Sequence, residues 1–483
     1  MLFSSTVFLF LFLPIVLGIY FIIPKKLKNT FLLLASLFFY AWGETFFVML
    51  MIFSIFFNYI CGLLIEKFKK RKVSTIILIL SIIGNLGLLG FFKYTNFIVN
   101  NINSVITLIK LPIINLSPVH LPIGISFFTF QAMTYVIDIY KNISPAQKNP
   151  INIALYISLF PQLIAGPIVR YHDIARQLLE RSTTIEKFSY GIRRFIIGLG
   201  KKVLIANTVA EVVDKIFVIP NTELTFSLAW LGIICYSLQI YFDFSGYSDM
   251  AIGLGYMFGF KFLENFNYPY ISRSIKEFWQ RWHISLSTWF KDYLYIPLGG
   301  NRKGKKRTYF NLLVVFILCG FWHGASWNFL IWGLYHGFFL VIERIGLSRL
   351  LEKTNIIIRH IYCLIVVMFG WVFFRSDTLT QSISYIKAML GLGIGTGIQY
   401  NLPMYLNNKV IFILIIGIIG SIPIIPMIEN HFDRLISIKN LRSRTIILTI
   451  SYFIVICSLT LILLISSMAL ASGTYNPFIY FRF

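Results

Sequence analysis

The sequence predicts an all-α, polytopic integral membrane protein, and three observations support this fold class. Of the 483 residues, 57% are hydrophobic and 13% are charged, whereas soluble domains average about 25% charged residues. The mean hydropathy is +0.76. The apolar segments are long and continuous, unlike the alternating segments of about ten residues that membrane β-barrels show. Helices are therefore expected to cross the bilayer.

Twelve apolar segments divide the chain. A spanning helix needs about 20 residues, so several segments are single spans, and the two longest, 224–258 and 309–342, are each expected to contain two helices. The segment at 31–41 is too short to span alone and predicts a tilted or partial helix before Gly43. The segments lie near residues 5–23, 31–41, 45–65, 74–92, 123–140, 151–169, 188–209, 224–258, 309–342, 356–375, 410–427 and 446–469.

The stretch 265–300 differs from these segments because it mixes charged residues with Trp and Phe. This pattern predicts interfacial helices that lie on, or dip into, the cytoplasmic leaflet. The chain contains no internal repeat, low-complexity tract or soluble domain. We therefore expect a single membrane domain over residues 1–483.

Lysines and arginines predict the orientation of the spans, because they concentrate in cytoplasmic loops. Basic clusters follow the first and third spans and precede the last one. This places the N-terminus outside and leaves residues 472–483 on the outer face, whereas the parity of 95–260 stays open. The net charge is +24, and the basic residues lie between apolar segments. This arrangement fits contact with anionic lipid and not with nucleic acid. The clusters are Lys25, Lys26 and Lys28; Lys67, Lys69, Lys70, Arg71 and Lys72; and Lys439, Arg442 and Arg444.

His323 is the leading candidate for a catalytic residue. It follows Trp322 in an apolar segment, and an imidazole at membrane depth is costly unless it faces a cavity or a partner. Glycines and an alanine on either side leave room for a channel, and Ser326 and Asn328 add polar groups at the same depth. Histidine can act as a base near neutral pH. The alternative is a histidine that is hydrogen-bonded to a helix carbonyl.

Two further histidines are candidates for the site. His283 follows Trp282 on the predicted interfacial helix, where it is either an interfacial residue or, if that helix folds inward to meet His323, part of the site. His336 lies further along the segment of His323 and has either a structural or a supporting role.

Two carboxylates in an apolar segment, Asp243 and Asp249, lie on opposite faces of the predicted helix. They therefore do not form a paired acid–base site, and each is expected to have a hydrogen-bond or arginine partner. The sequence contains no nucleotide-binding glycine loop and no metal-ligand spacing, so we expect neither a metal site nor a tightly bound cofactor. The cysteines lie in apolar stretches without metal spacing and are expected to be inert: Cys61, Cys235, Cys319, Cys363 and Cys457.

The C-terminal residues are unusually apolar for a tail. Five of the last six residues are bulky apolar or aromatic, and Pro477 cannot easily continue the last helix. The tail is either an aromatic anchor at the membrane interface or a segment that inserts into a groove of the protein. In the second case Tyr480 presents a phenol that a histidine base could activate.

Six motifs, taken together and in order, resemble the membrane-bound O-acyltransferase family, and within it the bacterial branch that O-acetylates alginate, cellulose and peptidoglycan. The resemblance implies a ring of tilted helices around a thin centre that a tunnel crosses. It also implies that His323 is catalytic and that His283 is a second functional position. The motifs are LPIGISFFTFQ (121–131), FPQLIAGPIVR (160–170), FDFSGYSD (242–249), RWHISLS (281–287), YIPLGGNR (295–302) and WHGASW (322–327).

The same resemblance extends to the tail. Systems that D-alanylate teichoic acids use a C-terminal aromatic motif whose tyrosine carries the acyl group outward. Residues 478–483 look like that motif fused to the enzyme, which implies that Tyr480 is an acyl carrier.

The sequence therefore predicts an O-acyltransferase of the bacterial inner membrane. It passes an acetyl group from a cytoplasmic donor, acetyl-CoA, to an extracellular polysaccharide or cell-wall polymer, through an extracytoplasmic partner acetyltransferase. His323 is the general base, and Trp322, Ser326, Asn328, His336 and Trp282 line the tunnel or support it. A transporter or flippase, and a scaffold of an export complex, are the alternatives. The donor is expected to enter beside four basic residues, whose charge suits its phosphates: Lys276, Arg281, Lys291 and Arg302.

Overall fold

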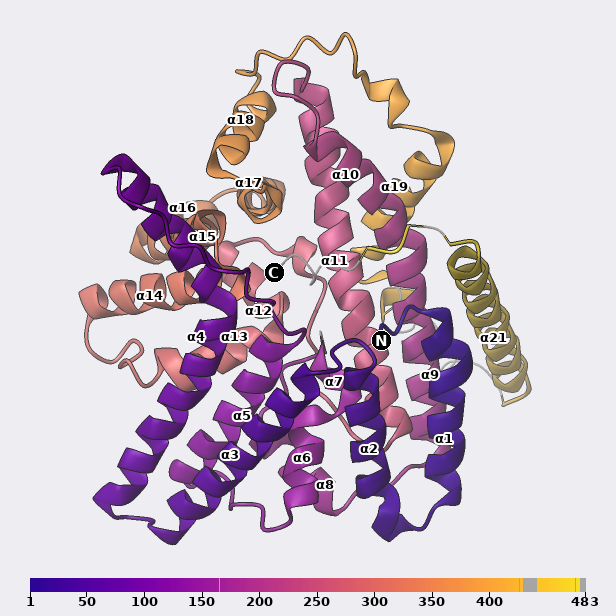
Figure 1. The fold of residues 1–483 in the computed structure, drawn as a ribbon. Coiled ribbons are helices and arrows are strands. Elements are labelled where there is room, and N and C mark those ends of the chain that lie inside the picture. Colours follow the sequence, from indigo (N-terminus) through magenta and orange to yellow (C-terminus); the bar gives the residue numbers. More distant parts are fainter. Residues whose placement is uncertain (165, 425, 429–440, 474, 478–483) are drawn as a thin grey trace.

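The computed structural model describes residues 1–164, 166–424, 426–428, 441–473 and 475–477, and every regular element in these ranges is a helix (Figure 1). Six of the described helices are long and apolar enough to cross a membrane, and two shorter apolar helices, Phe8–Ile22 and Asn408–Gly420, accompany them. The long ones are Phe47–Lys67, Lys72–Leu108, Phe226–Met257, Trp327–Glu352, Ile356–Arg375 and Thr445–Ala471. The predicted class, an all-α polytopic membrane protein, is confirmed.

The helices follow one another along the chain as listed here. The first half contains α1 (Leu13–Ile22), α2 (Lys28–Ala41), α3 (Phe47–Lys67), α4 (Lys72–Leu108), α5 (Ile125–Tyr140), α6 (Pro150–Ser158), α7 (Phe160–Leu163), α8 (Tyr171–Leu179), α9 (Ile185–Gly200), η3 (Lys201–Ala206) and α10 (Asn207–Phe217). The second half contains α11 (Phe226–Met257), α12 (Ile275–Arg281), α13 (Ile284–Phe290), η5 (Lys291–Tyr295), α14 (Lys305–His323), α15 (Trp327–Ile342), α16 (Ser348–Glu352), α17 (Ile356–Arg375), α18 (Leu379–Met389), α19 (Asn408–Gly420) and α21 (Leu441–Ala471).

Helix α11 is the buried centre around which the other helices gather. In Figure 1 it runs between α1, α2 and α9 on one side and α12, α14 and α15 on the other. It meets α9 at two reciprocal glycine contacts. A Cβ added at Gly198 would lie 2.5 Å from the carbonyl oxygen of Gly246, and one added at Gly191 would lie 2.5 Å from that of Gly253. Small residues at these points let the two backbones touch, as is common where helices pack in membranes.

The two longest apolar segments differ in how they fold. Residues 309–342 contain two helices as predicted, because α14 ends at His323 and α15 begins at Trp327. The prediction of two helices in 224–258 is wrong, since α11 is one continuous helix. Its carboxylates do not interrupt it because basic side chains neutralise them: Lys202 lies 2.7 Å from Asp243, and Arg194 and Lys201 each lie 2.7 Å from Asp249.

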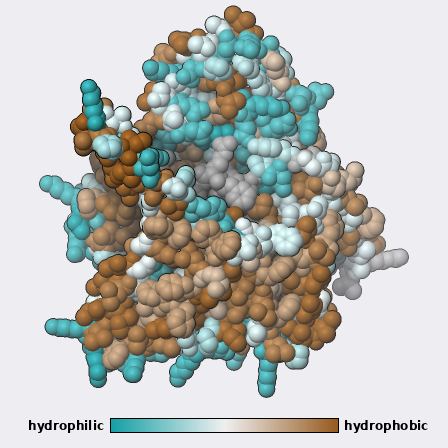
Figure 2. All heavy atoms as spheres, in the orientation of Figure 1, coloured by the Kyte–Doolittle hydropathy of each residue, from teal (hydrophilic) through white to brown (hydrophobic). Residues whose placement is uncertain are grey.

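The surface has the layered polarity of a membrane protein. Figure 2 shows a broad band of hydrophobic residues, with hydrophilic side chains projecting below it and covering the upper end. The start of α2 and the junction of α3 with α4, which carry two of the basic clusters, lie at the same lower end in Figure 1. This common side is what the charge pattern predicts, whereas the outward orientation of the N-terminus stays a prediction.

Candidate active site

His323 is the last residue of α14, at the turn of a tightly packed helical hairpin. Gly324 is extended (φ −164°, ψ 151°) and ends the helix. A Cβ added at Gly320 would overlap the carbonyl group of Phe329 on α15, so a glycine is needed for the two helices to approach this closely. Only 7% of His323 is exposed. The sequence motif therefore places the imidazole where a helix ends inside the protein.

Aromatic rings surround the imidazole of His323. Its centroid lies 5.0 Å from that of Trp322, 5.1 Å from that of Trp332 and 5.1 Å from that of Phe374, and each pair is arranged edge to face. These rings come from α14, α15 and α17. They shield the imidazole from water and fix the plane of the ring through packing.

His283 reaches the same region from a different element. The prediction that it lies on an interfacial helix is wrong, because it occupies the break between α12 and α13 with φ +43°. A non-glycine residue with positive φ is uncommon, so surrounding contacts must maintain it. The residue is 1% exposed, and its ring packs 4.6 Å from that of Phe244 on α11. The chain has folded inward at this point.

Hydrogen bonds determine which nitrogen of His283 carries its proton. Nδ1 lies 3.0 Å from Oδ1 of Asn265, which also accepts from the backbone N–H of Ser285 at 3.3 Å and from its hydroxyl at 2.9 Å. A backbone N–H can only donate, so this Asn265 atom is the amide oxygen, and Nδ1 of His283 must donate to it. The lone pair is therefore on Nε2, which has no hydrogen-bond partner among the described residues.

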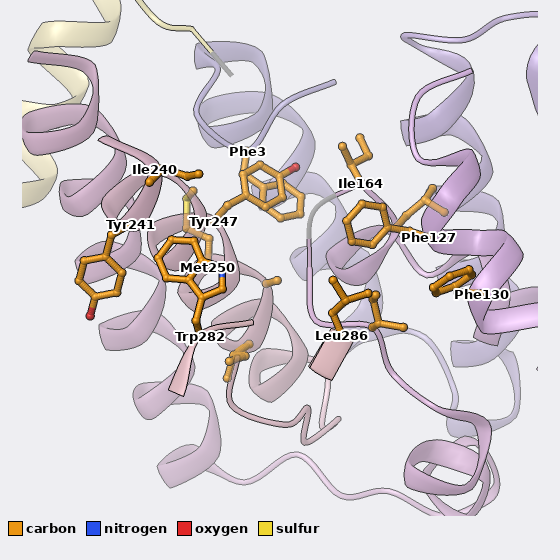
Figure 3. Close-up of a cluster of buried hydrophobic side chains, with 14 of the residues drawn as sticks. Phe3, Phe127, Phe130, Ile164, Ile240, Tyr241, Tyr247, Met250, Trp282 and Leu286 are labelled. Atoms are coloured by element: carbon orange, nitrogen blue, oxygen red, sulfur yellow. The ribbon is translucent and has the colours of Figure 1, made fainter. Parts of the chain in front are cut away.

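Trp322 joins the two histidines. Its ring centroid lies 6.3 Å from that of His283 and 5.0 Å from that of His323. Both imidazole rings therefore border the same indole ring. Figure 3 shows apolar side chains that line the neighbouring interior, among them Phe130 from α5 and Leu286 from α13. The ring of Phe130 lies 5.4 Å from that of Trp322, so apolar side chains border the region of the two histidines.

Two of the remaining residues predicted for the tunnel, Ser326 and Asn328, follow His323 closely in sequence, where α15 begins. Asn328 is buried and donates to the backbone oxygen of Ser376 at 2.6 Å, which anchors the start of α15. Ser326 immediately precedes that helix and is partly exposed. Ser326 therefore lies in the turn of the hairpin, and Asn328 lies in the first turn of α15.

His336 and Trp282 lie in an aromatic layer behind the site. The ring of His336 is 5.2 Å from that of Trp332, which in turn contacts His323. Trp282 packs 4.9 Å from Trp371 of α17. These contacts support the walls and do not place either side chain against the catalytic candidate.

The four basic residues predicted at the donor entrance differ in their exposure and in their ion pairing. Lys276, Lys291 and Arg302 are exposed, on α12, η5 and the loop before α14. Arg281 is half-buried, and its guanidinium pairs with Glu277 at 2.9 Å. Its charge is therefore already balanced within the protein.

The tail folds back onto the protein as far as it is described. Tyr480 lies outside the described residues, but Asn476 donates to the backbone oxygen of Ser4 at 2.8 Å and accepts from Asn207 at 3.1 Å. Lys202 donates to the backbone oxygen of Pro477. The chain after α21 thus returns to the helices that surround α11.

Sequence reasoning missed the polar residues that support the two histidines. Asn265 and Lys93 lie in none of the six motifs, and only the fold brings them to the site, whereas Ser285 lies within RWHISLS but was not singled out. A signal was available for Lys93, because it is a lone cation within a long apolar helix. Among the described residues, no group of three His, Cys, Asp or Glu side chains has the geometry of a metal site.

Comparison with known proteins connects this geometry to a family. A model of the membrane-bound O-acyltransferase family matches residues 123–383, which include both histidines. The chain is 42% identical over its whole length to the full-length protein named probable alginate O-acetylase AlgI of Pseudomonas putida. It is 48% identical to the protein of the same name of Pseudomonas syringae pv. tomato, over 81% of this chain and 76% of the relative.

A relative with a differently named substrate is similar over the same share of the chain. The peptidoglycan O-acetyltransferase of Helicobacter pylori is 39% identical, over 81% of this chain and 80% of the relative. Match lengths and identities of this order show common descent. The chain therefore belongs to the membrane-bound O-acyltransferase family and is a multi-pass membrane O-acyltransferase.

Proposed function

We propose that this enzyme transfers an acetyl group from a cytoplasmic donor, acetyl-CoA, for the O-acetylation of an extracellular polysaccharide or cell-wall polymer. The names of its relatives support acetyl transfer to a polymer of this kind. The observation that carries the proposal is the pair of buried histidines that share Trp322 inside a helical membrane protein. We further propose that the chain forms one membrane domain in the bacterial inner membrane, with both termini outside.

The chemistry requires one base and an activated donor. In our proposal the imidazole of His323 accepts the proton of the attacking hydroxyl group. At the same time the oxygen of that hydroxyl group bonds to the carbonyl carbon of the thioester. The C–S bond then breaks, and the imidazolium returns the proton to the departing thiolate. No oxidant or metal is needed, because a thioester is activated enough for a positioned base and proximity to suffice.

His283 is proposed as a second functional residue. Its Nε2 holds a lone pair, and Asn265 maintains the tautomer that leaves this pair available. Such a nitrogen accepts a hydrogen bond from a hydroxyl group or a water molecule and orients it. We assign the proton transfer to His323 and the orientation of a bound group to His283.

The donor is proposed to approach from the basic side. Exposed Lys276, Lys291 and Arg302 offer charge to its phosphates, whereas Arg281 is engaged with Glu277. Cysteine labelling at Lys303 checks the side of the membrane: we expect reagents to reach it from inside. Labelling from outside by an impermeant reagent would reverse the proposed direction of transfer.

Tyr480 is proposed as the acyl carrier. It lies three positions after Pro477, a reach of about 10 Å in an extended chain. Pro477 is bound by Lys202, whose partner Asp243 is next in sequence to Phe244, and the ring of Phe244 touches His283. The tail is therefore anchored at the same level of α11 as this contact, with Asp243 and Phe244 pointing about 100° apart around the helix. A partner acetyltransferase would take the acetyl group from Tyr480 on the outer face.

The carrier proposal has its own test. Tyr480→Phe keeps the ring and removes only the hydroxyl, so an aromatic anchor tolerates the change and a carrier does not. We expect Tyr480→Phe to abolish transfer to the polymer while the protein remains in the membrane. Wild-type acetylation of the polymer in that strain would exclude the carrier and leave direct transfer from the donor.

The experiment that tests the overall proposal is His323→Ala in membranes supplied with radiolabelled acetyl-CoA. We expect label to enter the polymer with the wild-type protein and to fall about 10²–10⁴-fold in the variant, the usual loss for a positioned base. Melting curves of the purified variant should match the wild type. Undiminished label would contradict the assignment and favour a transporter or a scaffold.

A further inference from the structure

The helix that carries His323 ends in an unusual way. The last carbonyl groups of an α-helix have no partner within the helix, and inside a membrane no bulk water replaces one. On α14 these are the carbonyls of Phe321, Trp322 and His323. Two consecutive residues of α4 bind all three: the hydroxyl of Tyr94 donates to Phe321 at 2.7 Å, and the ammonium of Lys93 donates to Trp322 and, at 3.0 Å, to His323.

Lys93 is committed to this role by its hydrogen bonds. The side chain is buried, and its ammonium group has three N–H donors. Two bind the carbonyls of α14, and the third points to the hydroxyl of Ser126 at the start of α5, at 3.4 Å. No donor is left for a substrate or for charge that develops in a reaction. A direct part in chemistry is therefore disfavoured, and a structural part in the site is favoured.

The electrostatics of the helix end favour a cation in this place. Aligned peptide dipoles leave partial negative charge at the C-terminus of a helix, and a cation there is stabilising. All three acceptors of Lys93 are uncharged groups, so the carbonyl dipoles of α14 provide the main compensation for its charge. Removing the ammonium would leave two carbonyl groups without a donor at the residue that bears the imidazole.

We infer that Lys93, assisted by Tyr94, is a positioning residue that clamps the final turn of α14 and thereby holds the main chain of His323. The inference rests on the proposed catalytic role of His323. A terminal turn is the part of a helix that frays most readily, and here it carries the base. A displacement of about 1 Å in a catalytic group can cost about 10²-fold in rate.

The test combines a structural and a kinetic measurement on purified protein in detergent. Hydrogen exchange of the peptide that contains residues 320–328 reports whether the last turn is clamped. Release of thiol from acetyl-CoA, used as the probe donor, reports turnover. We expect Lys93→Met to accelerate exchange in this peptide at least 10-fold and to lower kcat by 10- to 100-fold, with KM for acetyl-CoA changed less than 3-fold.

Three variants keep the test decisive if Lys93→Met does not fold. Lys93→Arg retains the charge and the donors and should recover most of the lost kcat. Tyr94→Phe removes one hydrogen bond and should give a smaller change in the same direction. Thr95→Val is the matched control, since its hydroxyl donates within α4, to the backbone oxygen of Phe91, and exchange in the 320–328 peptide should be unchanged.

Specific outcomes would overturn the inference. Unchanged exchange at 320–328 in both Lys93→Met and Tyr94→Phe would show that no clamp exists. A raised KM with unchanged kcat would show that Lys93 binds the donor instead. If the wild-type protein releases no thiol from acetyl-CoA, the donor of the proposed function is wrong, whereas the exchange data still decide on the clamp.

Discussion

The two histidines of the site are held by different contacts. A hydrogen bond from Nδ1 of His283 to Asn265 sets the tautomer of that side chain. At His323, Lys93 binds the main-chain carbonyl group, and aromatic rings pack against the imidazole. A hydrogen bond to the imidazole determines which nitrogen is basic, whereas hydrogen bonds to the main chain determine where the ring lies. The difference fits a division of labour in which one imidazole orients a group and the other moves a proton.

The sharpest way to break this comparison is to exchange each imidazole for an amide. We expect His323→Gln to lower acetyl transfer about 10²–10⁴-fold, as the loss of a base does. His283→Gln should cost less, because glutamine can still hydrogen-bond an oriented group. If the residues act as a unit, the double variant should be no worse than His323→Gln alone. Transfer assays in membranes measure all three, and a larger loss in His283→Gln would reverse the roles.

A second change addresses the hydrogen bond that sets the tautomer. Asn265→Ala removes the acceptor of Nδ1 and should lower transfer about 10- to 100-fold, the usual effect of losing a partner that orients a histidine ligand or base. Asn267→Ala, two residues away with an exposed side chain, is the matched control and should leave transfer near wild type. Equal rates in the two variants would mean that the orientation of His283 does not depend on Asn265.

A third histidine sharpens the contrast by having a carboxylate partner. Nδ1 of His172 lies 2.8 Å from a carboxylate oxygen of Asp138. This hydrogen bond raises the pKa of His172 above its ordinary value of 6.5, and the charge of Asp173 raises it further. Partial burial and the charge of Arg170 act in the opposite direction. The charged pair stabilises the folded state fully below pH 6.5, and its contribution is lost as pH rises through the higher folded pKa. An amide partner, as at His283, offers no such charge.

The expected effect at His172 is small and depends on pH. His172→Gln keeps a hydrogen-bond donor and removes the charge. The difference in Tm between wild type and variant should be largest near pH 6 and shrink toward pH 9. A difference that is constant across this range would show that the pair contributes through hydrogen bonding alone.

Much of the fold follows from sequence, since hydropathy and helix length reflect a single physical requirement, the transfer of apolar side chains into lipid. The hairpin at His323 follows for the same reason. The continuous α11 did not, because the length of the segment 224–258 suggested two spans. Hydropathy also contains no information about Lys202, Arg194 and Lys201, which neutralise Asp243 and Asp249 within the single helix.

The sequence analysis did not identify the supporting residues of the site, for a related reason. The motifs identified His323 and His283, but the left-handed backbone of His283 is maintained by Asn265, which is 18 positions away, and the clamp on His323 comes from a helix 230 positions away. Such contacts depend on how the helices meet in space. A single sequence shows the candidate reacting groups and a buried cation such as Lys93, but it does not show which groups that cation binds.

The hydrogen bond between Ser4 and Asn476 has a consequence for biosynthesis. Its two partners are 472 positions apart, so a ribosome that adds about 5–20 residues per second completes the second one tens of seconds after the first. During that interval the early helices are in the membrane and the tail segment does not yet exist. A nascent chain therefore acquires both histidines well before the contact between Ser4 and Asn476 can form.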